Sequence, residues 1–240
     1  MTETSPESKV EYEIINVERY NRSQRLHHWV HVISMLAFFL TGLELFIQMY
    51  FIGDYFLTRS FHFVLGIFIG AWDLLYFPYI LVKYNKIREI IPTPRDFLDL
   101  FIITLCYFRI LPDSKYPHHD FYILEEEKYV MKYHPGQKIL SVSNIFVIFG
   151  MGVTGIVLAE NVAPGAAGFF IPGFVIAVFS LIVIPFELLS INLRLIHFLG
   201  YLYFILTTLL HFYLAIIPSN QNRLRGIVTG KEKLRVARAE

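Results

Sequence analysis

The chain has 240 residues, of which 55% are apolar and 17% aromatic, and its formal net charge is +1. Apolar runs of about twenty residues indicate an all-α integral membrane protein rather than a soluble domain. The near-neutral charge gives no indication of nucleic-acid binding. The single cysteine, Cys106, excludes a disulfide framework, an iron–sulfur site and covalent haem attachment within this chain. Histidine is therefore the expected ligand for any metal, and any haem is expected to be non-covalent.

The apolar runs predict a four-helix transmembrane bundle with one extra apolar segment, within a domain of residues 19–217. The expected spans are residues 29–51, 61–82, 139–159 and 194–217, and the extra run is residues 169–189. A polar tail, residues 1–18, precedes the bundle, and a basic tail, residues 218–240, follows it.

Two shorter apolar segments are not expected to cross the membrane. Pro172 and Pro185 interrupt the extra run, which we interpret as a re-entrant or interfacial segment, with a fifth crossing helix as the alternative. The stretch 97–111 is too short to span and contains Asp99, so we expect an interfacial or docking helix there.

The distribution of basic residues predicts the topology. All lysines and arginines except Arg59 and Arg194 fall before the first span, between the second and third spans, or after the last one. The positive-inside rule therefore places both termini and the long middle connection in the cytoplasm. An even number of crossings follows, which is another reason to expect that residues 169–189 do not cross.

Four histidines stand at the ends of the expected spans: His28, His62, His197 and His211. His197 and His211 are fourteen residues apart, which is close to four helical turns, so they share one helix face about 21 Å apart. In a bilayer core about 30 Å thick, one lies near each surface. With the predicted orientation, His62 pairs with His197 outside and His28 pairs with His211 inside. Two facing histidines at one depth match bis-imidazole coordination of b-type haem iron.

Alternatives remain open from spacing alone. His27 and His31 flank His28, and spacing does not choose among the three. If residues 169–189 crossed the membrane, the two partners on the last span would be exchanged. A proton path or a zinc site is also compatible with intramembrane histidines. Zinc is disfavoured because no carboxylate or cysteine stands near them at short ligand spacing.

Three arginines support a haem interpretation. Arg25, Arg59 and Arg194 each precede one of the four histidines by three residues, about one helical turn nearer the surface. Guanidinium groups at that position are suited to bind haem propionates. Arg25 also has the ordinary explanation of a basic flank.

Small residues and one acid follow the same helix face as His62. Gly66 and Gly70 allow close approach of a macrocycle or of another helix, and the second is the more ordinary explanation. Asp73 lies eleven residues after His62 and is compatible with a proton route or with a local hydrogen bond.

These motifs resemble the cytochrome b (gamma) subunit of membrane-bound formate dehydrogenase, in the wider group that includes nickel–iron hydrogenase cytochrome b subunits. The segments that carry the resemblance are Arg25-Leu-His-His-Trp29, Arg59-Ser-Phe-His62, Lys132-Tyr-His-Pro-Gly-Gln-Lys138, Val153-Thr-Gly155, the His197/His211 pair and Arg225-Gly-Ile-Val-Thr-Gly-Lys231. The resemblance covers about residues 19–233.

The resemblance implies a four-helix subunit with two b haems, held by the same two histidine pairs, and it selects His28 over its neighbours. It also implies a menaquinone site near the inner haem, formed by His134, Gly136, Gln137 and His211. His134 stands where the family usually has asparagine, and residues 169–189 look like an insertion.

The predicted function is a membrane-anchoring subunit of a multi-subunit oxidoreductase in a prokaryotic cytoplasmic membrane. It would carry electrons from an outer-side iron–sulfur subunit to quinone on the cytoplasmic side, and the substrate-oxidising site would lie on another subunit. A formate dehydrogenase-type complex is the first expectation, and a nickel–iron hydrogenase or a sulfur-compound oxidoreductase is the alternative. A haem-free transporter or anchor is the competing class.

Overall fold

The computed structural model describes residues 12–84, 90–117, 122–124, 128–129, 132–165, 167–189 and 191–237. The outermost parts of both predicted tails, and parts of the predicted connection between the second and third spans, lie outside the described residues. The chain forms two compact units. Unit 1 combines the residues up to Val32 with those from Leu206 onward, and unit 2 comprises Ile33–Ile205.

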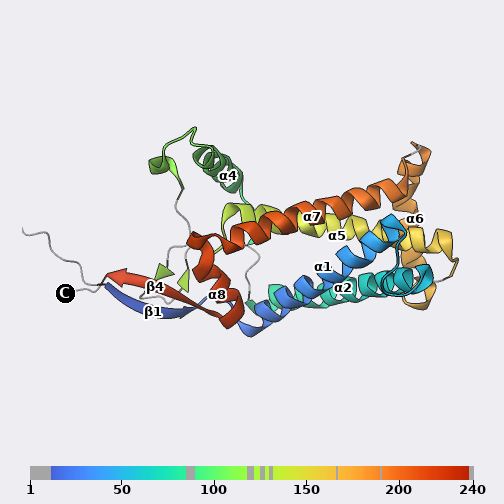
Figure 1. Ribbon diagram of the computed structural model, residues 1–240, viewed down its shortest axis with the longest axis horizontal. Helices are drawn as coiled ribbons and strands as arrows, with labels where there is room; N and C mark the ends of the chain where they lie inside the picture. The colour runs from blue at the N-terminus through green and yellow to red at the C-terminus, as the bar shows by residue number, and fades with distance from the viewer. Residues whose placement is uncertain are drawn as a thin grey trace, which may run out of the picture. The chain divides into compact units, whose positions relative to one another are not determined.

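Long helices dominate the described chain (Figure 1). They are α1 (Arg22–Ile47), α2 (Tyr55–Tyr84), α5 (Pro135–Val162) and α7 (Leu193–Ile216). Among the described residues, these four are long and apolar enough to cross a membrane. The predicted fold class is confirmed: the chain is an all-helical membrane protein with four spans and one extra apolar helix.

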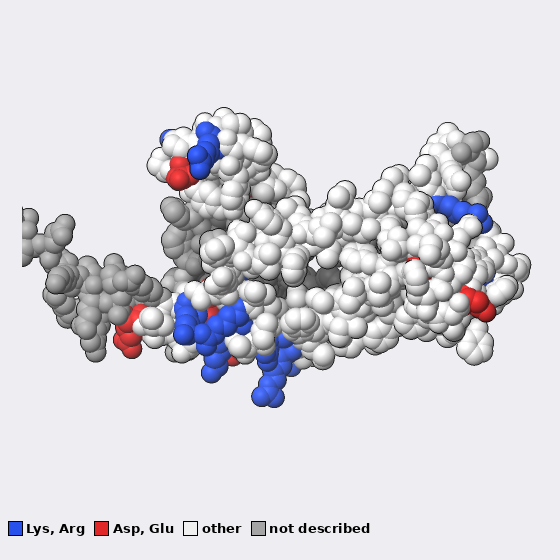
Figure 2. Space-filling model, in the orientation of Figure 1, with Lys and Arg blue, Asp and Glu red and all other residues white. Residues whose placement is uncertain are grey.

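The surface of the spans is apolar. Large side chains such as Leu74 (77% exposed) and Phe146 (71% exposed) point away from the protein. On the face drawn in Figure 2, charged side chains gather toward the ends of the long helices, while the surface over their middle is largely uncharged. This is the reverse of a water-soluble bundle and fits helices whose outward faces meet lipid.

In unit 2 the extra apolar run forms the short helix η2 (Ala167–Phe169) and helix α6 (Gly173–Leu188). Val183 of α6 packs with Val153 and Val157 of α5 and with Leu193 of α7 in one buried cluster. The last turns of α5 and the first turns of α7 therefore lie at the same end of the unit. Because the chain leaves α5 and enters α7 at that end, α6 does not complete a crossing between them.

The connection at the end of α1 is fixed by a buried acid that sequence reasoning missed. Glu44 accepts hydrogen bonds from the backbone N–H groups of Phe51 and Ile52, both at 3.1 Å, and from the hydroxyl of Thr58 at 2.8 Å. A buried carboxylate is tolerated where its oxygens are satisfied in this way. Glu44 thus holds the loop between α1 and α2.

Helix α4 (Pro94–Tyr107) lies in the connection between the second and third spans, with the shorter elements η1 (Asp113–Lys115), β2 (Tyr122–Ile123) and β3 (Lys128–Tyr129). Its first turn is closed by a capping box in which Thr93 and Asp96 bond each other's backbone N–H. Lys138 of α5 pairs with Asp96 at 2.9 Å, so α4 is attached to the start of α5. A helix is thus observed where one was predicted for residues 97–111, beginning and ending a few residues earlier.

Unit 1 contains a strand pair that the sequence reading did not anticipate. Strand β1 (Tyr12–Glu18) pairs antiparallel with β4 (Lys231–Ala237), and α8 (Gln221–Thr229) follows the short helix η3 (Pro218–Asn220). Since a hydrogen-bonded strand pair lies on one side of a bilayer, both ends of the described chain are on the same side. This agrees with an even number of crossings.

Candidate metal-binding histidine pairs

Unit 2 brings His62 and His197 together. His62 lies in the second turn of α2 and His197 in the second turn of α7, and their ring centres are 6.3 Å apart. Both side chains are half-buried. The structure therefore joins the two histidines that the sequence predicts as the outer pair, and it does not form the exchanged pairing in this unit.

Each of these imidazoles contacts a threonine through Nδ1. Thr41 Oγ1 lies 2.7 Å from His62 Nδ1, and Thr154 Oγ1 lies 2.8 Å from His197 Nδ1. Thr41 comes from α1 and Thr154 from α5, so all four long helices contribute to this site. With Nδ1 engaged, Nε2 is the nitrogen left for a ligand on each ring.

The ring separation matches coordination of one metal. An imidazole nitrogen lies about 1.1 Å from its ring centre and about 2.0 Å from a bound metal, so two rings on opposite sides of one ion have centres about 6.2 Å apart. The 6.3 Å of His62 and His197 agrees with this value.

Four glycines on the helices that carry the outer pair and its threonines differ in how much space surrounds them. Gly42 of α1 and Gly155 of α5 are closely packed, whereas Gly66 and Gly70 of α2 face open space. A Cβ added to Gly155 would stand 3.2 Å from Cε1 of His197, and one added to Gly42 would stand 3.1 Å from the Tyr201 ring. By contrast, a Cβ at Gly66 or Gly70 would meet nothing within 4 Å. The open side is the α2 face that carries His62, as a bulky ligand there requires.

Unit 1 brings His28 and His211 together. Their ring centres are 6.4 Å apart, again the separation expected for two ligands of one metal. Nδ1 of His28 and Nε of Arg25 are buried and have no hydrogen-bond partner among the residues that the structure describes. Arg25 is otherwise fixed by a 2.6 Å hydrogen bond from Nη1 to the carbonyl of Val228. Buried polar atoms without partners mark a place where a polar ligand fits.

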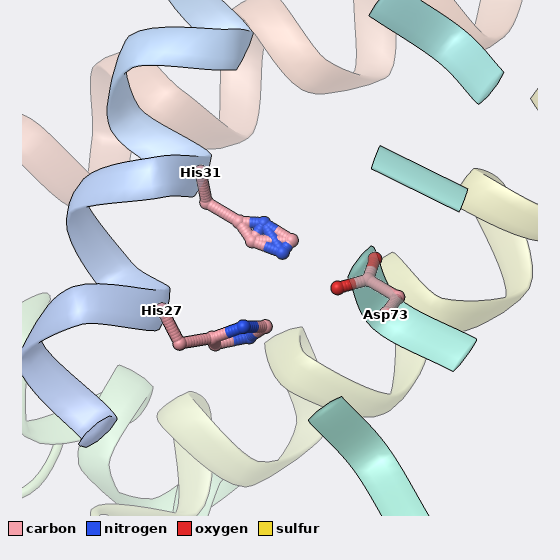
Figure 3. Close-up of side chains that lie close together, drawn as sticks. All are labelled: His27, His31 and Asp73. Carbon is pink, nitrogen blue, oxygen red and sulfur yellow. The ribbon is translucent and has the colours of Figure 1, made fainter. Parts of the chain in front are cut away.

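The neighbours of His28 are arranged differently. His27 and His31 project together from α1, one turn apart, with their ring centres 4.3 Å from each other (Figure 3). The structure thus places His28 beside His211, and places the two flanking histidines beside each other. Asp73, also drawn in Figure 3, comes from α2 and belongs to unit 2.

The two outer arginines differ in their surroundings. Nη1 of Arg59 is buried and has no hydrogen-bond partner in the described part of the chain, and the guanidinium lies 5.9 Å from the centre of the Tyr55 ring. Arg194 is exposed at the start of α7, where its backbone N–H bonds the side chain of Asn192. Of these two arginines, Arg59 is the one with a buried donor that no described residue accepts.

The segment predicted to contact quinone forms the start of α5. His134 is the residue preceding the helix, and its Nδ1 accepts a 3.1 Å hydrogen bond from the Gly136 N–H. Gln137 returns the interaction by accepting from the His134 N–H at 3.1 Å. These residues form a helix cap, and His211, the remaining predicted member of the quinone site, belongs to unit 1.

Sequence reasoning missed the threonines beside the outer histidines. Thr154 was part of the Val153-Thr-Gly155 motif, but no role was predicted for its hydroxyl, and Thr41 was not singled out. The available signal was weak: a single threonine well inside an apolar run, on a different helix from the histidine it contacts. Thr41 is 21 positions from His62 and Thr154 is 43 positions from His197, so the contacts form only in the tertiary structure.

An all-helical membrane bundle with facing histidine pairs at metal-binding separation has the architecture of membrane-bound b-type cytochromes. Comparison with protein families agrees: residues 19–230 match the family described as prokaryotic cytochrome b561. The chain belongs to this family, whose members bind haem b.

A curated relative is also similar to the chain. It is the F420 non-reducing hydrogenase II cytochrome subunit of Methanosarcina mazei, 26% identical over 205 residues. The similarity covers 81% of this chain and 74% of the relative.

Proposed function

We propose that this chain is a dihaem cytochrome b subunit that carries electrons through the membrane between a partner oxidoreductase outside and quinone at the cytoplasmic side. The observation that carries the proposal is the presence of two histidine pairs, each with ring centres 6.3 or 6.4 Å apart. When bound, haem b accepts and passes on single electrons. The protein's part is to hold the two groups at different depths and to set their surroundings.

In this proposal His62 and His197 hold the outer haem, and His28 and His211 hold the inner one. The two ligands on α7 are fourteen residues apart, which is about 21 Å along a helix. Arg25 and Arg59 are the best candidates to bind propionates, because each has a buried nitrogen that no described residue accepts from. Arg194 is a weaker candidate because it is exposed.

Quinone reduction consumes protons, and we assign the proton donor to His134. Its Nδ1 accepts the Gly136 N–H, so its proton must stand on Nε2, the nitrogen able to donate to a quinone carbonyl. Gly136 and Gln137 keep the imidazole in this orientation through the helix cap. Menaquinone is the quinone that the family resemblance implies.

The identity of the electron donor rests on the comparisons. The curated relative carries the name of a hydrogenase cytochrome subunit, which favours a hydrogenase-type complex with an iron–sulfur subunit and a catalytic subunit. The sequence resemblance to formate dehydrogenase subunits supports a formate-oxidising complex instead. Copurification of the complex, followed by assays with hydrogen and with formate, separates the two donors.

The central test is haem content in the detergent-purified protein. We expect a dithionite-reduced minus oxidised spectrum typical of haem b and two haems per chain by pyridine haemochrome. Alanine variants of each predicted ligand should retain one haem: His28→Ala, His62→Ala, His197→Ala and His211→Ala. The matched controls His27→Ala and His31→Ala should retain two. A folded but colourless protein would refute the proposal and favour a transporter or anchor.

A further inference from the structure

The two threonines of the outer pair share a hydrogen-bond arrangement that the proposed electron transfer does not itself require. Thr41 Oγ1 lies 2.8 Å from the carbonyl of Ala37, four residues earlier on α1. Thr154 Oγ1 lies 2.8 Å from the carbonyl of Gly150, four residues earlier on α5. Each hydroxyl therefore contacts both a backbone carbonyl and an imidazole nitrogen.

This arrangement determines the direction of the hydrogen bonds. A hydroxyl has one proton, and a carbonyl can only accept. If the threonine donated to the imidazole, its oxygen and the carbonyl oxygen would be two acceptors 2.8 Å apart with no proton between them. The hydroxyl of each threonine must therefore donate to the carbonyl and accept from Nδ1–H of the histidine.

We infer that Thr41 and Thr154 are positioning residues that fix both outer histidines as Nδ1–H tautomers and make the outer haem harder to reduce. This inference rests on the proposed function, since it concerns the ligands assigned to the outer haem. A hydrogen bond from Nδ1–H orients the ring and raises the basicity of Nε2. A more basic ligand stabilises oxidised iron, which lowers the midpoint potential of that haem.

The inner pair lacks the same support on one side. In the described part of the chain, Nδ1 of His28 is buried without a hydrogen-bond partner, whereas Nδ1 of each outer histidine has one. The difference assigns the lower potential to the outer haem and the higher one to the inner haem. Electrons entering outside would then move toward the inner haem with a favourable free-energy change.

A threonine that bonds its own helix carbonyl often has no further role, because it merely satisfies its hydroxyl inside an apolar environment. Thr104 of α4 is such a case in this chain: its Oγ1 bonds the carbonyl of Leu100 at 2.8 Å, and the residue is exposed. It provides a matched control, with the same local bond and no hydrogen bond to an imidazole among the described residues.

The test is spectroelectrochemical titration of the purified full-length protein, together with electron paramagnetic resonance of the oxidised haems. Thr41→Val and Thr154→Val should each keep two haems, raise the midpoint potential of one of them and change its g-values. The affected component should be the one that disappears in His62→Ala. Thr41→Ser and Thr154→Ser should restore wild-type behaviour, and Thr104→Val should change nothing.

The inference would be overturned if both valine variants kept two haems with unchanged midpoint potentials. It would also be overturned if the serine variants shifted the midpoint potential as much as the valine variants do, or if the serine variants lost haem. If a valine variant loses one haem and its serine counterpart retains it, the hydroxyl is responsible and the inference is supported. Wild-type protein without haem would refute the proposed function itself, whereas two haems with insensitive potentials would refute only the role of the threonines.

Discussion

Lys138 donates a 2.9 Å hydrogen bond to Oδ1 of Asp96, and so ties the first turn of α5 to the first turn of α4. The side chains are only 13% and 6% exposed. Thr93 also donates to Asp96, through its backbone N–H and its hydroxyl, both at 2.7 Å. Burial alone would raise the pKa of the Asp96 carboxyl, but these bonds outweigh it and hold the pKa below its ordinary value of 3.8.

This pair predicts a pH-dependent stability. Because the pKa of Asp96 is lower in the folded state, its contribution is fully present above the ordinary value and is lost as the pH falls through the folded value. Asp96→Asn should destabilise the protein at neutral pH by roughly 3 kcal/mol and weaken the loss of stability in acid. Thermal unfolding in detergent between neutral and acidic pH measures both effects.

The matched control is Arg95→Gln. Arg95 is 84% exposed and lies 3.8 Å from Asp99, so its loss should leave the unfolding temperature nearly unchanged. Equal effects of Asp96→Asn and Arg95→Gln would contradict a special role for the buried pair.

Arg59 should influence the outer haem more than Arg194 does. Reduction adds negative charge, so removing a nearby half-buried cation disfavours reduction. Arg59→Gln should lower the midpoint potential of the outer haem, the opposite direction from the threonine variants. Arg194→Gln should have a smaller effect that decreases with salt, because exposed charges are screened. Redox titration of both variants at two ionic strengths measures these effects. Equal shifts of the midpoint potential in Arg59→Gln and Arg194→Gln would argue against Arg59 as the propionate ligand.

The two roles assigned to His134, helix capping and proton donation, can be tested separately. Asparagine is a strong helix N-cap, so His134→Asn should keep the stability of α5, whereas His134→Ala should cost about 1 kcal/mol. Both variants lack the titratable proton and should slow reoxidation of the reduced haems by added quinone, by roughly 100-fold if His134 is the donor. Stopped-flow spectroscopy measures this rate. Wild-type rates in His134→Asn would leave His134 as a cap only.

Glu44 should stabilise the loop after α1. Glu44→Ala leaves the N–H groups of Phe51 and Ile52 and the hydroxyl of Thr58 without their acceptor, and should cost roughly 2–3 kcal/mol. Faster proteolysis between α1 and α2, with both haems retained, is the expected result. Glu160→Ala is the comparison, because Glu160 accepts the N–H groups of Gly165 and Ala167 in the connection after α5. If the Glu160→Ala variant were also cleaved faster between α1 and α2, Glu44 would not be the residue that specifically stabilises that loop.

The spans could be predicted from the sequence because lipid demands a continuous apolar surface of known length. The proximity of the histidines was also predictable: the fourteen-residue spacing places His197 and His211 on one face, and the distribution of basic residues predicts the antiparallel order. Spacing alone does not choose His28 over His27 and His31, and the family resemblance does. The structure agrees, because His28 is the one that lies beside His211.

Other features of the structure could not be predicted from local sequence patterns. Thr41 and Thr154 act on histidines of other helices, and Glu44 acts on a loop of ordinary composition. The strands at the two ends were predicted to be polar tails because each is short and mixes apolar with charged residues. Their pairing supplies backbone hydrogen bonds that neither segment has alone, and the buried ion pair between Arg19 and Glu232 at 2.7 Å joins the same two segments.

That pairing sets an order of events during synthesis. Strand β1 precedes all four membrane spans in the chain, whereas Lys231–Ala237, with which it pairs, follows all of them. During synthesis β1 therefore waits for its partner until the four spans have been produced. A chain that stopped before Lys231 would leave β1 without its neighbouring strand and Arg19 without the carboxylate of Glu232.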